Sequence, residues 1–147
     1  MRVVAPTPGV GASHGDGENA EMHHLAQFAL LAACGGAGAL LRAGLTSAVS
    51  RWLGDGFPWG TLLVNVGGSF TFGAIAGLAR SRGGLPAGLE MPLLVGLLGG
   101  FTTYSSFAFQ AVELLERGRA AAAGGYVVAT NVLAIIAAWA GMRAFTS

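Results

Sequence analysis

The sequence is poor in charge and contains no lysine. Only 10% of its 147 residues are charged, and all eight basic residues are arginines. A soluble globular domain carries about 25% charged residues, so this chain has too little charge to cover a water-exposed surface. The formal net charge is +1, and no nucleic-acid partner is expected.

Cysteine is almost absent as well. The single Cys34 lies inside an apolar segment, so no disulfide can form within the chain, and the cysteine count does not indicate a redox compartment. We expect Cys34 to be a small apolar packing residue. The apolar segments also lack a nucleophile–base pair and a set of metal ligands. These absences argue against an enzyme.

Long apolar segments are what the sequence does have. Hydrophobic residues make up 53% of the chain, and the mean hydropathy is +0.61. A helix needs about 20 residues to cross the hydrocarbon core of a bilayer. Four segments are long enough: residues 25–49, 58–79, 91–115 and 121–145. The sequence therefore predicts an all-α membrane protein with four transmembrane helices, in one domain over residues 25–147.

The first 24 residues differ in composition, because they are rich in glycine, proline and polar residues. They lack the basic start, apolar run and cleavage site of a signal peptide. We predict a disordered tail over residues 1–24, and Met22 is an alternative start. His14, His23 and His24 could suggest metal binding, but the composition favours an unstructured tail.

The arginines are evenly divided between the two sides of the predicted membrane domain. With four spans, one side holds both termini and Arg2, Arg80, Arg82 and Arg143, whereas Arg42, Arg51, Arg117 and Arg119 fall on or toward the other. Orientation normally follows an excess of basic residues on the cytoplasmic side. A chain without that bias should insert both ways. Two copies can then pair as an antiparallel, dual-topology homodimer.

The second apolar segment has small and polar residues at four-residue spacing, which places them on one helix face. They are Thr61, Asn65, Ser69, Gly73 and Gly77. The glycines predict close packing against another helix. A buried amide such as that of Asn65 is costly in lipid unless it bonds a neighbour or lines a wet path.

The third apolar segment contains the polar stretch GGFTTYSSF over residues 99–107. Each glycine costs a helix about 1 kcal/mol relative to alanine, so the helix is expected to unwind here. Unwound backbone at membrane depth must be buried in protein or line a cavity. Its carbonyls would suit a cation, while its hydroxyls and N–H groups could face an anion. A packed kink in a structural helix is the alternative.

Aromatic and hydroxyl side chains could complete such an anion path. Tyr104 and Phe107 share a face if the helix resumes after the break, and aromatic rings have a positive edge. Ring edges with asparagine and hydroxyl donors would form a weakly electropositive lining without a full charge. In the fourth segment, Tyr126 and Thr130 share a face, whereas Asn131 points elsewhere.

Three motifs together resemble the small bacterial fluoride channels of the Fluc or CrcB family. They are GGAGALLR over residues 35–42, GTLLVNVGGSF over residues 60–70 and GLLGGFTTYSSF over residues 96–107. The resemblance implies an antiparallel dimer of four-helix subunits in the bacterial inner membrane. In each subunit the third helix would be broken in mid-membrane, and each dimer would have two fluoride pores for passive export and a central structural sodium ion.

The resemblance also implies roles for individual residues. Sodium would be held by the backbone carbonyls of Gly99 and Thr102. The remaining implied residues would line the fluoride path, with Asn65, Tyr104, Ser106, Phe107 and Thr130 in the pore and Arg42 and Thr61 at the vestibule.

Two residues depart from the family pattern. Tyr104 replaces a common phenylalanine, and Gln110 replaces an acidic residue.

Small dual-topology multidrug or cation transporters are the main alternative, but they need a membrane-embedded carboxylate, and none lies mid-span here. A structural assembly subunit would not explain Asn65 together with the hydroxyl run. A paralogue could give a heterodimer, although the balanced arginines favour self-pairing.

Overall fold

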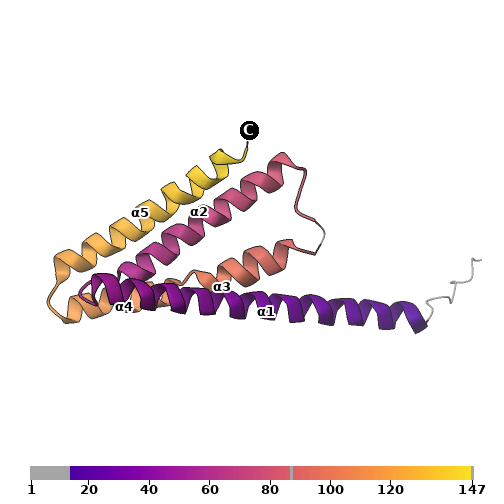
Figure 1. Ribbon diagram of the computed structural model, residues 1–147, viewed down its shortest axis with the longest axis horizontal. Helices are drawn as coiled ribbons and strands as arrows, with labels where there is room; N and C mark the ends of the chain where they lie inside the picture. The colour runs from indigo at the N-terminus through magenta and orange to yellow at the C-terminus, as the bar shows by residue number, and fades with distance from the viewer. Residues whose placement is uncertain (1–13, 87, 147) are drawn as a thin grey trace, which may run out of the picture.

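The computed structural model describes residues 14–86 and 88–146, and all its regular structure is helical (Figure 1). The elements are α1 (His14–Leu53), α2 (Trp59–Ser81), the π-helix η1 (Met91–Leu98), α3 (Gly99–Phe101), α4 (Tyr104–Glu116) and α5 (Ala120–Ala144). Together η1, α3 and α4 make up the third apolar segment.

Four helical stretches are long and apolar enough to cross a membrane. They are His24–Leu53, Trp59–Ser81, Met91–Glu116 and Ala120–Ala144. The predicted number of spans is confirmed, and each lies close to the apolar segment that predicted it. The chain is therefore a multi-pass, all-helical membrane protein.

Helix α1 begins earlier than the sequence predicted. It starts at His14, within the segment assigned to the tail, and its N-terminal end projects beyond the other helices (Figure 1). Once a helix has formed, each added residue gains a hydrogen bond for one fixed backbone unit, so the helix can extend past its apolar part. Residues 1–13 of the predicted tail lie outside the described residues.

Helices α2 and α5 lie side by side and pack through glycines (Figure 1). A Cβ atom on Gly73 would overlap the carbonyl oxygen of Ala138, and one on Gly77 would overlap that of Met142. From the other side, a Cβ on Gly141 would overlap the carbonyl oxygen of Phe70. The glycine row of the second segment is therefore a helix-packing face, as predicted.

Helix α1 contacts η1 and α3 in the same way. A Cβ on Gly38 would overlap the carbonyl oxygen of Leu97, and one on Gly100 would overlap that of Gly35. The Cβ of Cys34 lies 3.0 Å from the position a Cβ on Gly96 would take. Cys34 thus has the packing role predicted for it. These contacts hold the first half of the third segment against α1.

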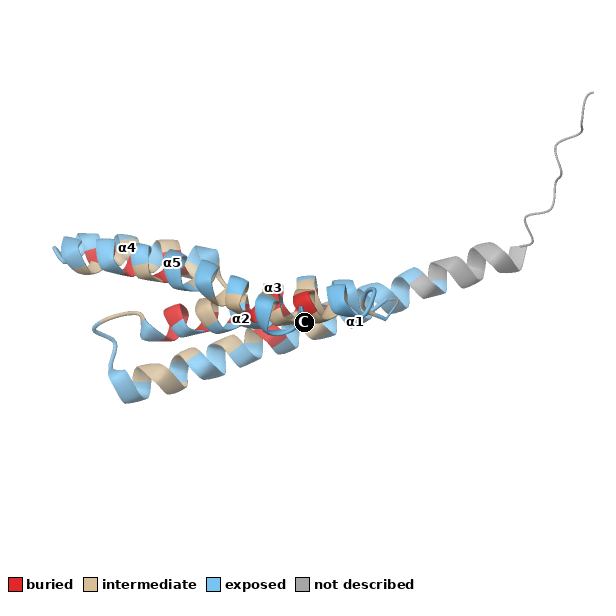
Figure 2. Cartoon of the chain, turned by 90° about the horizontal axis from the view of Figure 1, so that it is seen from above, coloured by how far each residue is buried: buried red, intermediate tan, exposed pale blue. Residues whose placement is uncertain are grey.

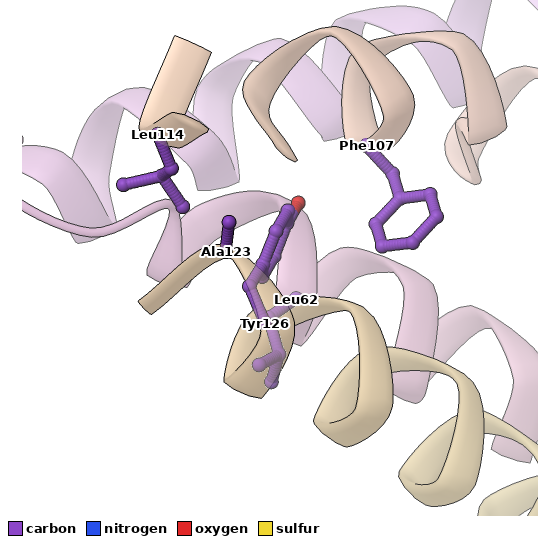
Figure 3. Packing of buried hydrophobic residues seen from close by; sticks show 5 residues of the cluster. All are labelled: Leu62, Phe107, Leu114, Ala123 and Tyr126. Carbon is purple, nitrogen blue, oxygen red and sulfur yellow. The ribbon is translucent and has the colours of Figure 1, made fainter. Parts of the chain in front are cut away.

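A small core joins α2, α4 and α5. It contains Leu62, Phe107, Leu114, Ala123 and Tyr126 (Figure 3). Outside this core, exposed residues run along all the helices (Figure 2). They include large apolar side chains, such as Trp52, which is 89% exposed. Such exposure fits helices whose outer faces meet lipid or another subunit.

The connection from α4 to α5 needs a glycine. Gly118 has φ of 70°, a left-handed backbone conformation that glycine adopts without steric cost. The N–H of Arg119 then donates to the carbonyl of Leu114 at 2.9 Å, which closes the end of α4. The Arg119 guanidinium also donates to the carbonyl of Gly56, so this connection is tied to the one between α1 and α2.

Candidate functional site

The third segment loses helical geometry at two threonines. Thr102 has φ −79° and ψ 157°, and Thr103 has φ −151° and ψ 114°, both extended. Helix α3 ends directly before them and α4 begins directly after. The glycine pair before this point and the two β-branched residues at it both weaken a helix. The interruption is called the break below.

Asn65 on α2 pairs with the extended backbone of the break. Its Oδ1 accepts a hydrogen bond from the Thr103 N–H at 2.8 Å, and its Nδ2 donates to the Thr103 carbonyl at 3.1 Å. The side-chain amide thus bonds both the N–H and the carbonyl of Thr103, as the backbone of a neighbouring β-strand would. An unpaired backbone group away from water is costly, so Asn65 stabilises the break. One N–H of its Nδ2 remains for another partner.

The pairing with Asn65 releases a carbonyl. In an unbroken helix the Thr103 N–H would donate to the Gly99 carbonyl, but here it donates to Asn65. The Ser106 N–H, which would donate to the Thr102 carbonyl, instead donates to Thr103 Oγ1 at 3.3 Å. The carbonyls of Gly99 and Thr102 have therefore lost their usual helical donors.

A third freed carbonyl has a different partner. Arg42 Nε donates to the Gly100 carbonyl at 3.1 Å. In this subunit the guanidinium lies on the backbone of α3, with the side chain half-buried, and the place of Arg42 at a vestibule stays a prediction. Its positive charge lies where helix carbonyls end, which is favourable. Arg42 is thus part of the support of the break.

Thr103 caps the helix that resumes after the break. Its Oγ1 accepts from the Ser106 N–H and donates to Ser106 Oγ at 3.0 Å. Sequence reasoning did not single out Thr103, although threonine directly before a helix is a common N-cap. Ser106, a predicted pore residue, is occupied in this cap. Thr102 Oγ1 donates to the Leu98 carbonyl at 2.9 Å.

A cavity of about 260 Å³ lies beside the break. Five predicted site residues line it, namely Asn65, Thr102, Tyr104, Phe107 and Thr130, together with Ser69, Thr103, Asn131, Ala134 and Ile135. No lining residue is charged. Gly99 instead lines a neighbouring cavity, in which Thr102 also takes part.

Two hydroxyl-bearing residues of the predicted path are buried. Thr130 is 5% exposed, and its Oγ1 has no hydrogen-bond partner among the described residues. A buried hydroxyl without a partner costs free energy, so this hydroxyl is available to a molecule or ion in the cavity. Thr61 is 3% exposed and lines neither of the two cavities at the break, and its place at a vestibule stays a prediction.

The two predicted pore aromatics differ in exposure. Tyr104 is 76% exposed, whereas Phe107 is 5% exposed. Their ring centroids lie 5.3 Å apart, and the Phe107 ring lies 5.2 Å from that of Tyr126 on α5. Phe107 therefore joins the cavity wall to the core, while Tyr104 leaves one side of the cavity open.

Comparison with known proteins gives one consistent family. Residues 29–142 match the family described as CrcB-like protein, Camphor Resistance (CrcB). The Fluoride-specific ion channel FluC 1 of Nitrobacter hamburgensis is 43% identical over 117 residues, which cover 79% of this chain and 93% of that protein. The Fluoride-specific ion channel FluC of Rhizobium leguminosarum is 47% identical over 115 residues, which cover 78% and 92%.

Proposed function

Because the chain belongs to the CrcB-like family, we propose that it forms a fluoride-selective channel through which fluoride leaves the cytoplasm passively. Its relatives are named as ion channels, so the chain is not an enzyme. The observation that supports the proposal most directly is the uncharged cavity beside the break, which has hydrogen-bond donors but no charged lining residue.

The cavity suits a small and strongly hydrated anion. The free N–H of Asn65, the unpartnered hydroxyl of Thr130 and the hydroxyl of Tyr104 can replace water around such an ion. The positive ring edge of Phe107 adds a weak attraction. Because no full positive charge lies in the lining, the ion is not trapped and can leave.

The same lining disfavours a proton-coupled exporter of cationic drugs. Such a transporter needs a carboxylate inside the membrane, and none of the residues that line the cavity carries one. Glu113 and Glu116 lie in the last turn of α4, and Glu90 directly precedes η1. The lining therefore favours a channel over a proton-coupled exporter.

A structural sodium ion fits the freed carbonyls of the break. Gly99 and Thr102 have lost their helical donors, while the carbonyls of Gly100 and Thr103 are bonded to Arg42 and Asn65. Among the described residues no cluster of His, Cys, Asp or Glu could hold a metal. Sodium would therefore be bound by backbone oxygens, and it would balance their partial negative charge.

A second copy of the chain would complete the channel. Tyr104 lines the cavity yet is 76% exposed, so the cavity is open on that side. Because the sequence predicts four arginines on or toward each side of the membrane, an antiparallel homodimer with two pores in the bacterial inner membrane is the arrangement proposed.

The antiparallel arrangement predicts two orientations in the membrane. A reporter fused after Phe145 should be found on both sides, because neither side has an excess of arginine. Added arginines next to Arg143 should fix one orientation and serve as the control. A reporter confined to one side in the unmodified protein would contradict dual topology.

The uncharged lining predicts selectivity by size and hydrogen-bond strength. Purified protein in liposomes should release fluoride, and chloride release should stay at the level of empty liposomes. Ion-selective electrodes for the two halides measure both in matched vesicles. Comparable chloride release would contradict the proposed function.

A further inference from the structure

The end of the molecule where α2 and α5 finish has three exposed arginines. Figure 1 shows the two helices side by side and ending together near the C-terminus. Arg80 lies in the last turn of α2, Arg82 directly follows that helix, and Arg143 lies in the last turn of α5. All three side chains are exposed. These three arginines are called the basic end below.

No carboxylate on the same two helices balances this charge. Neither α2, over Trp59–Ser81, nor α5, over Ala120–Ala144, contains an acidic residue. The next acidic residue along the chain after Arg82 is Glu90, which directly precedes η1. Among the residues that the structure describes, no arginine of the basic end takes part in an ion pair. The basic end is therefore a patch of positive charge.

At the opposite end of the helices, carboxylates accompany the arginines. Arg117 is paired with Glu113 at 3.2 Å, and Asp55 lines the same small cavity as both of them. The Arg119 guanidinium donates to the Gly56 carbonyl. The even division of the arginines between the two sides thus conceals an unequal distribution of net charge.

Contacts between α2 and α5 bring the arginines of the two helices together at the membrane interface. Arg80 Nη1 lies 2.8 Å from Met142 Sδ, and Met142 directly precedes Arg143. The Arg143 guanidinium lies 5.6 Å from the centre of the Trp139 ring, which is 60% exposed. Exposed tryptophan is typical of the boundary between lipid and water. The basic end therefore lies at the depth of the lipid headgroups.

An exposed apolar stripe leads from the basic end along α5. Its members recur at three- and four-residue spacing from Arg143 and so share one helix face; they are Trp139, Ile136, Val132 and Val128, all exposed. The stripe is separate from Ala138 and Met142, which pack against α2, and none of its residues lines the cavity beside the break. A headgroup at Arg143 would place its acyl chains along this stripe.

We infer that the basic end binds the phosphate group of an anionic phospholipid. A guanidinium donates two parallel hydrogen bonds to a phosphate, and Arg80, Arg82 and Arg143 supply the guanidinium groups. The headgroup of phosphatidylglycerol adds no positive charge to its phosphate, whereas phosphatidylcholine has an ammonium that the arginines would repel. The apolar stripe makes a lipid, and not a free phosphate ion, the occupant.

Two matched double variants and a charge-keeping variant test the site. Arg82→Gln/Arg143→Gln removes two charges from the basic end, and Arg51→Gln/Arg117→Gln removes two exposed charges from the opposite end. Arg82→Lys/Arg143→Lys keeps the charge. Purified full-length protein in a neutral detergent is titrated with dioleoylphosphatidylglycerol or dioleoylphosphatidylcholine, and native mass spectrometry counts the bound lipid.

The unmodified protein should bind phosphatidylglycerol more tightly than phosphatidylcholine. Arg82→Gln/Arg143→Gln should weaken phosphatidylglycerol binding by about tenfold or more, because each basic residue near an anionic headgroup adds to the attraction. Its binding of phosphatidylcholine should not change. The opposite-end variant and the lysine variant should both keep most of the affinity for phosphatidylglycerol.

Three results would overturn the inference. Equal binding of the two lipids by the unmodified protein would show that the headgroup is not recognised. An equal loss in the two glutamine variants would show that only the overall charge matters. Displacement of the lipid by an equal concentration of inorganic phosphate would show a site for a free anion.

The unmodified protein still decides the matter if Arg82→Gln/Arg143→Gln does not fold. Potassium chloride at about 1 M screens exposed charges beyond a few ångströms, so it should abolish the preference for phosphatidylglycerol. A preference that survives this salt would contradict a site made of exposed arginines. Lipid binding is measured without transport, so the inference and the proposed function can fail independently.

Discussion

Asn65→Asp should reduce fluoride efflux by about a hundredfold or more. The change keeps the size of the side chain but replaces the Nδ2 donor by an oxygen, which would face the Thr103 carbonyl that Nδ2 now bonds. It also places a negative charge on a residue that lines the proposed anion cavity. Repulsion between charges about 4 Å apart is several kcal/mol even at an effective dielectric of about 20.

The loss of fluoride efflux in Asn65→Asp can be compared with the loss in Phe107→Leu. Toward the anion, that change removes the electropositive ring edge, a weak contact of about 1 kcal/mol, and inside the protein it removes the ring contacts with Tyr104 and Tyr126. Because it adds no charge, Asn65→Asp should be at least as severe. Efflux is measured with a fluoride electrode, and size-exclusion chromatography checks that both variants keep the oligomeric state of the unmodified protein. If folded Asn65→Asp protein conducts fluoride normally, Asn65 is only a structural link between α2 and the break, and the pore lies elsewhere.

Gly99→Pro should abolish the stabilisation of the protein by sodium. Proline lacks the N–H that Gly99 donates to the Gly96 carbonyl, and its ring clashes with the preceding helical turn. The carbonyl of Gly99, one of the two proposed sodium ligands, would then be displaced. The measurement is the unfolding temperature of purified protein in sodium compared with a large organic cation, which does not require transport.

Two controls keep the Gly99 carbonyl in place. A Cβ at Gly99 would meet only the Leu94 carbonyl at 3.9 Å, an ordinary contact, so Gly99→Ala should retain the sodium effect. Thr102→Ala should retain it too, because it removes the hydroxyl bond to Leu98 but leaves the backbone carbonyl. A sodium effect that survives Gly99→Pro but is lost in Thr102→Ala would show that the hydroxyl, and not the carbonyls, binds the ion.

A further variant covers the case in which Gly99→Pro does not fold. Asn65→Leu removes the acceptor that now holds the Thr103 N–H, so this N–H can return to the Gly99 carbonyl. The sodium effect should weaken although residue 99 is unchanged. An undiminished sodium effect in folded Asn65→Leu protein would contradict the link between Asn65 and the freed carbonyl.

The sequence alone determined the membrane class and the number of spans. Apolar runs of about 20 residues with little charge can satisfy their backbone in lipid only as helices, and the structure has four such helices. The glycine row ending in Gly73 and Gly77 was also readable, because residues four apart share a face and small residues allow close approach.

Only the tertiary structure decided what the polar residues bond. Composition showed that Asn65 needed a partner, but not that both ends of its amide would pair with Thr103, a residue 38 positions away. Nor did the sequence show that the Arg42 guanidinium would bond the Gly100 carbonyl, 58 positions along the chain. A side chain's hydrogen-bond capacity is a local property, whereas its partner is fixed by how two helices pack, and helix packing brings together residues that the sequence separates.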